Sequence, residues 1–431
     1  MTIVAETPVS RASAGLGARA YWGQLLVLAS AMAAAGHART ALSPLQEAMR
    51  LDLGFTDTQM ALLQGAVIGA PIALSAIPLG LAIDRWNRKR LLIALVLLSA
   101  LGSALTAVLS DFTALAVARC LAGVAALSIV PVVLSLVSDL AVPEQRGGAT
   151  TVAIVGQVAG NAAAFALGGA LLTALPSADG SWRITMGWLT VPLLPVALLL
   201  LILREPARAQ GEMPQAGLGA ALHGLRGRRR ALAAVTLGIM LTETAIGAIL
   251  IWAAPFLARQ HALPPDQIGT LMALTMLASG LIGPLLGGLL ADRSQRVGGP
   301  RLTLTMLAGL SLLAAPLAAF GWVSSTALVA TLLICSATML LAIAVMGIAL
   351  FTILAPPAIR GLCSSLLMAG ILLFSLGLAP SLVSETTRWL GGEGQLGAAL
   401  SLIGITASPL AALVFGLGSR RSAAPNALAT A

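Results

Sequence analysis

The chain has 431 residues, of which 58% are hydrophobic and 10% are charged, and its mean hydropathy is +0.96. Soluble domains usually carry about 25% charged residues, so this composition excludes a water-soluble fold. The net charge of +9 does not indicate nucleic-acid binding, because the basic residues fall into alternate loops and form no long patch interleaved with aromatic side chains.

Apolar runs long enough to cross a bilayer as helices recur along the chain. They do not alternate with the period of two that is expected of barrel strands, so they predict an all-α membrane protein. The predicted transmembrane helices cover residues 21–48, 59–83, 90–110, 112–137, 149–173, 185–203, 231–258, 267–291, 302–321, 326–354, 362–384 and 396–418.

Twelve spans in two groups of six indicate an internal duplication. We therefore expect two pseudo-symmetric six-helix bundles, over residues 21–203 and 231–418, joined by a cytoplasmic linker over 204–230. Residues 1–20 and 419–431 are the expected tails. The alternate basic loops place both termini in the cytoplasm by the positive-inside rule. The Ala-, Gly- and Arg-rich composition suggests a bacterium, and hence the inner membrane.

A basic motif occurs twice on the expected cytoplasmic side, as GLAIDRWNRKR at 80–90 and GGLLADRSQR at 287–296. Asp292 follows Asp84 by 208 residues (292 minus 84), close to half the chain. A glycine four residues before each aspartate allows two helices to approach closely. The aspartate can accept hydrogen bonds from a helix N-terminus, and the arginines can pair with acids or headgroups. We interpret the two copies as latches between helices that separate and re-form, since a purely topogenic loop would explain only the arginines. The latch residues are Gly80, Asp84, Arg85, Arg88, Gly288, Asp292 and Arg293.

These motifs resemble those of the major facilitator superfamily. GLAIDRWNRKR is similar to its loop between spans two and three, and Arg119 with Gly123 is similar to its span-four arginine motif. SDLAVPEQRGGAT resembles its loop between spans four and five, which adds Asp139, Glu144 and Arg146 to the latch. The resemblance covers almost the whole chain. It implies the twelve-helix fold of that superfamily and a secondary active transporter.

Within the superfamily, DRWNRKR, DLGFTDTQ and the loop after span four most resemble the spinster-like transporters. That group typically carries an aspartate before the span-one arginine and a glutamate in span four, where this chain has Ala38 and Ala126. The resemblance implies lysophospholipid-like or other lipid-derived anions as substrates. Gly156 and Gly160 resemble the span-five signature of drug/proton antiporters, but Asn161 stands where that signature has proline.

Ionisable residues inside spans are costly, by at least about 2.5–3.5 kcal/mol at the centre, so the few present are functional candidates. Glu243 is expected near the midplane, where it could exchange protons with help from Thr242 and Thr244, or remain a permanently protonated acid. Arg39 and Arg119 are expected at one depth and could attract a carboxylate or phosphate. The alternatives are snorkelling for Arg39 and a structural role for Arg119.

Three polar residues complete the candidate substrate or coupling site. His37 points about 200° away from Arg39 around the helix, so it is either a separate proton site or a packing residue. Gln157 and Asn161 lie one turn apart on one face of span five. They could contact a substrate or another helix.

We expect a secondary active transporter that moves a small organic, anionic or amphipathic lipid-like substrate by alternating access, coupled to protons. The alternative is a multidrug/proton antiporter that exports cationic or hydrophobic compounds. We see no ATP-binding motif, cofactor motif, metal-ligand cluster or nucleophile–base pair, so we expect no enzyme, no metal and no cofactor. The fold needs no protein partner. We therefore expect a monomer that meets its substrate, the bilayer and a coupling ion, and no nucleic acid.

Overall fold

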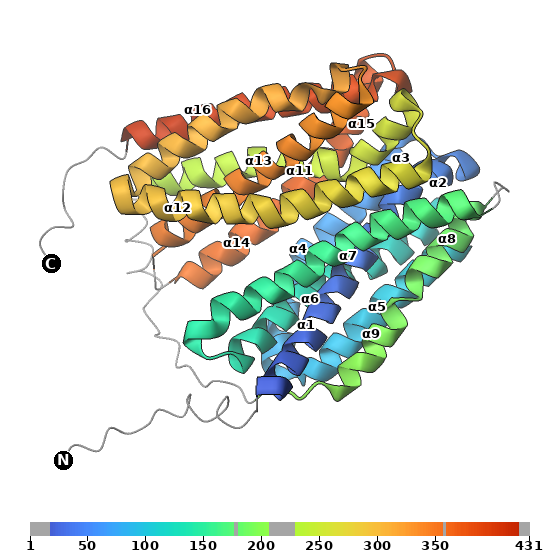
Figure 1. Cartoon of the computed structure of the whole chain (residues 1–431), viewed down its shortest axis with the longest axis horizontal. Coiled ribbons are helices and arrows are strands. Elements are labelled where there is room, and N and C mark those ends of the chain that lie inside the picture. The colour runs from blue at the N-terminus through green and yellow to red at the C-terminus, as the bar shows by residue number, and fades with distance from the viewer. Residues whose placement is uncertain (1–17, 176–179, 207–228, 357–358, 422–431) are drawn as a thin grey trace, which may run out of the picture. The chain divides into compact units, whose positions relative to one another are not determined.

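The computed structural model describes residues 18–175, 180–206, 229–356 and 359–421, and these are helical with no strand among them (Figure 1). Eleven helices in this part of the chain are long and apolar enough to cross a membrane. One of them, Pro265–Trp322, breaks at Gly299, where φ is 61° and ψ is −157°. Its two arms cover the predicted spans 267–291 and 302–321. The predicted all-α membrane fold is therefore confirmed.

The chain divides into two compact units. Unit 1 takes in residues 1–63, 74–213 and 264–273. Unit 2 takes in residues 64–73, 214–263 and 274–431. Each unit thus includes one short helical segment from the other half of the sequence. Most of the predicted linker, residues 207–228, and of the two predicted tails lies outside the described residues, so the predicted bundle boundaries stay a prediction.

Unit 1 is built from the first half of the chain. Its helices are α1 (Ala18–Thr40), η2 (Ser43–Leu45), α2 (Gln46–Leu53), α3 (Asp57–Ala61), α5 (Arg88–Val108), α6 (Phe112–Leu140), η4 (Pro143–Gln145), α7 (Arg146–Ala174), α8 (Ser181–Thr190), α9 (Leu193–Leu199) and η5 (Leu200–Ile202). Residues of η3 (Leu62–Ala66), α4 (Val67–Arg85) and α12 (Pro265–Leu317) belong partly to each unit.

Local signals in the sequence set the helix ends of unit 1. The side chains of Asn87 and Asp111 accept hydrogen bonds from backbone N–H groups in the first turns of α5 and α6. Thr56 and Gln59 form a reciprocal capping box at the start of α3. Gly54 ends α2 in the left-handed region, at φ 64°, which glycine adopts without steric cost. These caps fix where the spans begin and so which residues reach the interior.

Small residues bring α1 and α7 together, and the two helices lie side by side in Figure 1. Gly156 and Gly160 of α7 lie against the backbone carbonyl groups of Ala29 and Ala33 of α1, so closely that a Cβ on either glycine would overlap them. Such contacts let helices associate by packing alone in a bilayer. Asn161 follows directly, which sets a polar side chain at the crossing.

Unit 2 is built from the second half of the chain. Its helices are most of α12, with η6 (Ala318–Trp322), and α11 (Arg229–His261), α13 (Thr326–Leu354), α14 (Arg360–Leu372), η8 (Leu373–Leu378), α15 (Ala379–Trp389), η9 (Glu393–Gln395) and α16 (Leu396–Arg421). Helix α11 packs against α13 and α16. The buried Trp252 of α11 donates from Nε1 to the Pro380 carbonyl of α15 at 3.1 Å. These contacts hold the middle of α11, which carries Glu243, inside the unit.

Candidate functional site

A fully enclosed arginine lies inside unit 1. Arg119, about two turns into α6, is 0% exposed. Its three guanidinium nitrogens have no hydrogen-bond partner among the described residues. A desolvated charge without a partner costs several kcal/mol. The residue that resembles the span-four arginine of the superfamily is therefore held in this conformation at an energetic cost, which an anion could relieve.

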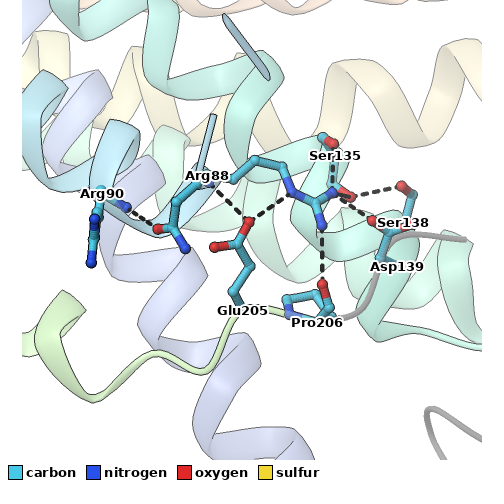
Figure 2. Close-up of polar contacts among 8 residues, drawn as sticks. Arg88, Arg90, Ser135, Ser138, Asp139, Glu205 and Pro206 are labelled. Carbon is cyan, nitrogen blue, oxygen red and sulfur yellow. Dashed lines mark hydrogen bonds and ion pairs between the residues drawn. The ribbon is translucent and has the colours of Figure 1, made fainter. Parts of the chain in front are cut away.

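Arg88 shows the opposite arrangement, because its guanidinium is buried among acceptors (Figure 2). Its Nη1 lies 2.5 Å from Oδ2 of Asp139 and 3.0 Å from the hydroxyl of Ser135, both on α6. Its Nε lies 3.5 Å from Oε1 of Glu205, and Nη2 donates to the Pro206 carbonyl at 3.1 Å. The same Glu205 oxygen accepts from the Arg88 backbone N–H at 2.9 Å. This cluster joins α5, α6 and the segment after span six.

The other first-half latch residues lie nearer the surface. Asp84 and Arg85 at the end of α4 are exposed, as is Glu144 of η4. Arg146 is half-buried, and its Nε donates to the Ala141 carbonyl at 3.3 Å. Of the predicted first-half latch, the structure thus shows an ion pair between Arg88 and Asp139.

The second copy of the motif is held by hydroxyl groups. Ser294 Oγ and Thr303 Oγ1 lie 2.8 Å apart in the interior of unit 2, and Gln295 Nε2 donates to the same Thr303 oxygen at 2.8 Å. These residues stand on either side of the break at Gly299. The two copies therefore occupy matching places in the sequence, but different chemistry holds them.

The glycines of the two motifs do not behave as expected. A Cβ added at Gly80 or Gly288 would meet no heavy atom of the described residues within 4 Å, so neither makes the expected close helix approach there. The adjacent Gly287 does, because it lies against the Ala342 carbonyl of α13. Asp292 and its neighbouring arginine at 293 are exposed.

The polar candidates of span five meet α1. The Thr40 hydroxyl of α1 donates to Oδ1 of Asn161 at 3.0 Å. Gly36 of α1 lies against the backbone carbonyl of Gln157. Gln157 itself is half-buried. For Asn161, contact with another helix is therefore the use that the structure shows, whereas the use of the Gln157 side chain stays a prediction. Arg39, next to Thr40, is half-buried.

His37 has a carbonyl partner on span six. Its Nε2 lies 2.7 Å from the backbone oxygen of Leu189, and because a carbonyl only accepts, this nitrogen carries the proton. That oxygen stands where span six breaks between α8 and α9, beside Pro192. The imidazole thus donates to a backbone carbonyl at the break in span six and ties α1 to that span.

Glu243 lies in the interior of unit 2 and is 8% exposed. Its neighbours cannot support it as expected. The Thr242 hydroxyl donates to the Gly238 carbonyl and the Thr244 hydroxyl to the Met240 carbonyl, each at 2.9 Å. A threonine hydroxyl has one proton to donate, so neither is a donor to the carboxylate. The expectation that they supply hydrogen bonds to Glu243 is wrong.

The structure contains two polar clusters that the sequence patterns do not predict. Glu205 was missed because it lies beyond the last residues of span six and 117 positions from its partner Arg88. At the start of α8, Trp182 Nε1 donates to Asp52 at 2.8 Å, and Arg183 caps the end of α5 by donating to the Leu109 carbonyl at 2.7 Å. An acid beside a proline after span six, and a Trp–Arg pair before it, were the available signals.

A family model, "Major Facilitator Superfamily", matches residues 28–369. The chain belongs to the major facilitator superfamily. The fold predicted from the two basic motifs is therefore confirmed, and it is the fold of a multi-pass membrane protein.

Two transporters and one solved structure illustrate its similarities. The 3-(3-hydroxy-phenyl)propionate transporter of Escherichia coli (strain K12) is 32% identical over 64% of this chain and 63% of its own length. A triacylglyceride transporter of Mycolicibacterium smegmatis is 31% identical over 38% of this chain and 29% of its own length. The chain thus spans less than two thirds of these relatives. A bacterial homologue of the human lysosomal transporter Spinster, inward-facing and unoccupied, shares the fold with a TM-score of 0.80 at 21% identity, over 94% of this chain and 98% of that one.

Proposed function

We propose that this member of the superfamily moves a small organic anion across the membrane by alternating access, with Arg119 as the anion ligand. The observation that carries the proposal is the enclosed guanidinium of Arg119, which has no hydrogen-bond partner among the residues described. The other buried arginines, Arg50 and Arg88, lie within 3 Å of a carboxylate oxygen. Arg119, by contrast, has no carboxylate partner among the described residues, so we propose that the substrate supplies one.

The energetic argument favours a carboxylate. An unpaired buried charge destabilises the state that contains it, and a ligand shifts a conformational equilibrium only through its differential affinity for the two states. An anion that reaches Arg119 after the surrounding helices move would favour that rearranged state. Arginine offers a planar fork that matches the two oxygens of a carboxylate. The name of the E. coli relative contains such a group, and the triacylglyceride transporters support a substrate with a lipid-like apolar part.

Proton coupling is assigned to Glu243 in this proposal. Its carboxyl is buried in a membrane span, where an ionised group is costly, so binding of the coupled proton there would remove that cost. The Arg88 cluster would hold the cytoplasmic ends of α5 and α6 during one half of the cycle. We further propose that the transporter acts as a monomer in a bacterial inner membrane, with both termini in the cytoplasm, as the basic loops favour.

Counterflow into proteoliposomes tests the proposal. Wild type, Arg119→Met and Glu243→Gln would each be purified and reconstituted into proteoliposomes. The vesicles would be preloaded with 3-(3-hydroxyphenyl)propionate, a lysophospholipid or a cationic dye. We expect anion counterflow by the wild type, none by Arg119→Met, and exchange without net proton-driven uptake by Glu243→Gln. Counterflow of the cationic dye that needs Glu243 and survives in Arg119→Met would refute the proposal in favour of a drug/proton antiporter.

A further inference from the structure

The buried hydroxyl of Ser103 on α5 differs from neighbouring hydroxyls in its hydrogen bonding. Serines and threonines inside helices commonly donate to a carbonyl of the preceding turn. Ser99 and Thr106, on the same face of α5, do so at 2.8 Å, to the carbonyl groups of Val96 and Gly102. Ser103 is 1% exposed, and its Oγ lacks a hydrogen-bond partner among the described residues. Its oxygen is thus a fully enclosed donor with no partner in the described part of unit 1.

Helix geometry places Ser103 beside Arg119. A Cβ on Gly102 would lie 2.7 Å from the Ala118 oxygen and 2.5 Å from the Ala122 nitrogen, so α5 and α6 cross at this level. Each residue turns a helix by about 100°, and α5 and α6 run in opposite directions. The residue after Gly102 and the residue after Ala118 therefore emerge on the same side of the helix pair. On α6 the crossing is centred midway between Ala118 and Ala122, one residue beyond Arg119, and on α5 Ser103 is one residue beyond Gly102. Because the helices are antiparallel, both residues lie at the same height, about 1.5 Å from the crossing.

We propose that Ser103 is a second ligand of the anion that Arg119 binds, an inference that rests on the proposed function. A carboxylate has two oxygens and about four acceptor positions. The guanidinium fork fills two of them, and the Ser103 hydroxyl can donate to a third. Neither side chain hydrogen-bonds to the other, because each lacks any partner among the residues that the structure covers. Both sets of donors are therefore uncommitted, and they select an acceptor-rich monoanion over a cation.

The test compares two alanine variants on one face of α5. The Kd of 3-(3-hydroxyphenyl)propionate would be measured by calorimetry on the purified full chain. We expect Ser103→Ala to bind at least about tenfold more weakly, because it loses a hydrogen bond to a charged group. Its ligand-free unfolding temperature should not fall, since the hydroxyl has no bond to lose. Ser99→Ala is the matched control. Ser99 is equally buried, but its hydroxyl already donates to a backbone carbonyl, so this variant should bind the anion as tightly as wild type.

The outcomes separate the two proposals. If Arg119→Met abolishes binding while Ser103→Ala binds like wild type, the role of Ser103 is refuted and the proposed function stands. If Ser99→Ala and Ser103→Ala weaken binding equally, α5 has merely loosened and the role of Ser103 is again refuted. If wild type binds no anion, or Arg119→Met still binds one, both proposals fail.

Discussion

Replacing Arg119 by methionine should raise the stability of the ligand-free protein. The guanidinium is 0% exposed and has no hydrogen bond to lose among the described residues. Replacing even a paired buried ion by apolar side chains of similar size often stabilises by about 1–4 kcal/mol. An unpaired ion has no attraction to forfeit, and the unbranched methionine adapts to the space. We therefore expect Arg119→Met to raise the free energy of unfolding by about 1–4 kcal/mol while it abolishes anion binding.

Arg88→Met is the matched control, because it makes the same substitution at a buried arginine that has partners. It would strand Asp139 and Glu205, whose side chains are 13% and 20% exposed. Breaking a buried pair costs about 3–5 kcal/mol, so this variant should be destabilised. The assay is thermal unfolding of both ligand-free variants and wild type in one detergent. If both variants lose stability to a similar extent, Arg119 has a structural role and the reasoning is refuted.

Three further substitutions test the packing that surrounds the site, each by thermal unfolding. Gly160→Ala would drive a Cβ into a carbonyl of α1 and should lower stability sharply, whereas Gly148→Ala, in open space on the same helix, should gain up to about 1 kcal/mol; equal effects would contradict the close crossing. Thr40→Val leaves Oδ1 of Asn161 without its donor and should cost about 1–3 kcal/mol; an unchanged unfolding temperature would show another donor. Trp182→Phe keeps an aromatic ring but removes the fused pyrrole ring of a buried indole together with its hydrogen bond to a carboxylate, and should cost at least about 1.5–3 kcal/mol; no loss would show that neither the bond nor the packing contributes to stability.

Hydropathy and internal repetition were enough to predict the spans, because a membrane-crossing helix must satisfy its backbone internally and present about twenty apolar residues. The predicted gap between spans 267–291 and 302–321 contains the break, but its exact place depends on φ of 61° at Gly299, which hydropathy does not encode. The predicted span boundaries differ from the observed ends by a few residues, where the helices are set by caps such as Asn87 and Asp111.

Partners across the fold were harder to predict than positions within it. Arg88 and Asp139 were placed in one latch by their motifs, and they do pair. Glu205 was not, because no local pattern links it to a residue 117 positions away. The sequence offers His37 as a proton site, and its partner in the structure is a backbone carbonyl of span six, 152 positions away. Such contacts depend on tertiary geometry, which one sequence does not specify.

Buried ionisable residues of opposite kind lie in the two units. Among the described residues, the buried arginines, Arg50, Arg88 and Arg119, all lie in unit 1, and the buried acid, Glu243, lies in unit 2. On the proposed function, an anion neutralises Arg119 and a proton neutralises Glu243. Each neutralisation lowers the desolvation cost of the state that encloses that residue. The carrier loaded with both would then enclose the least uncompensated charge, which is the electrostatic condition for moving an anion and a proton in the same direction.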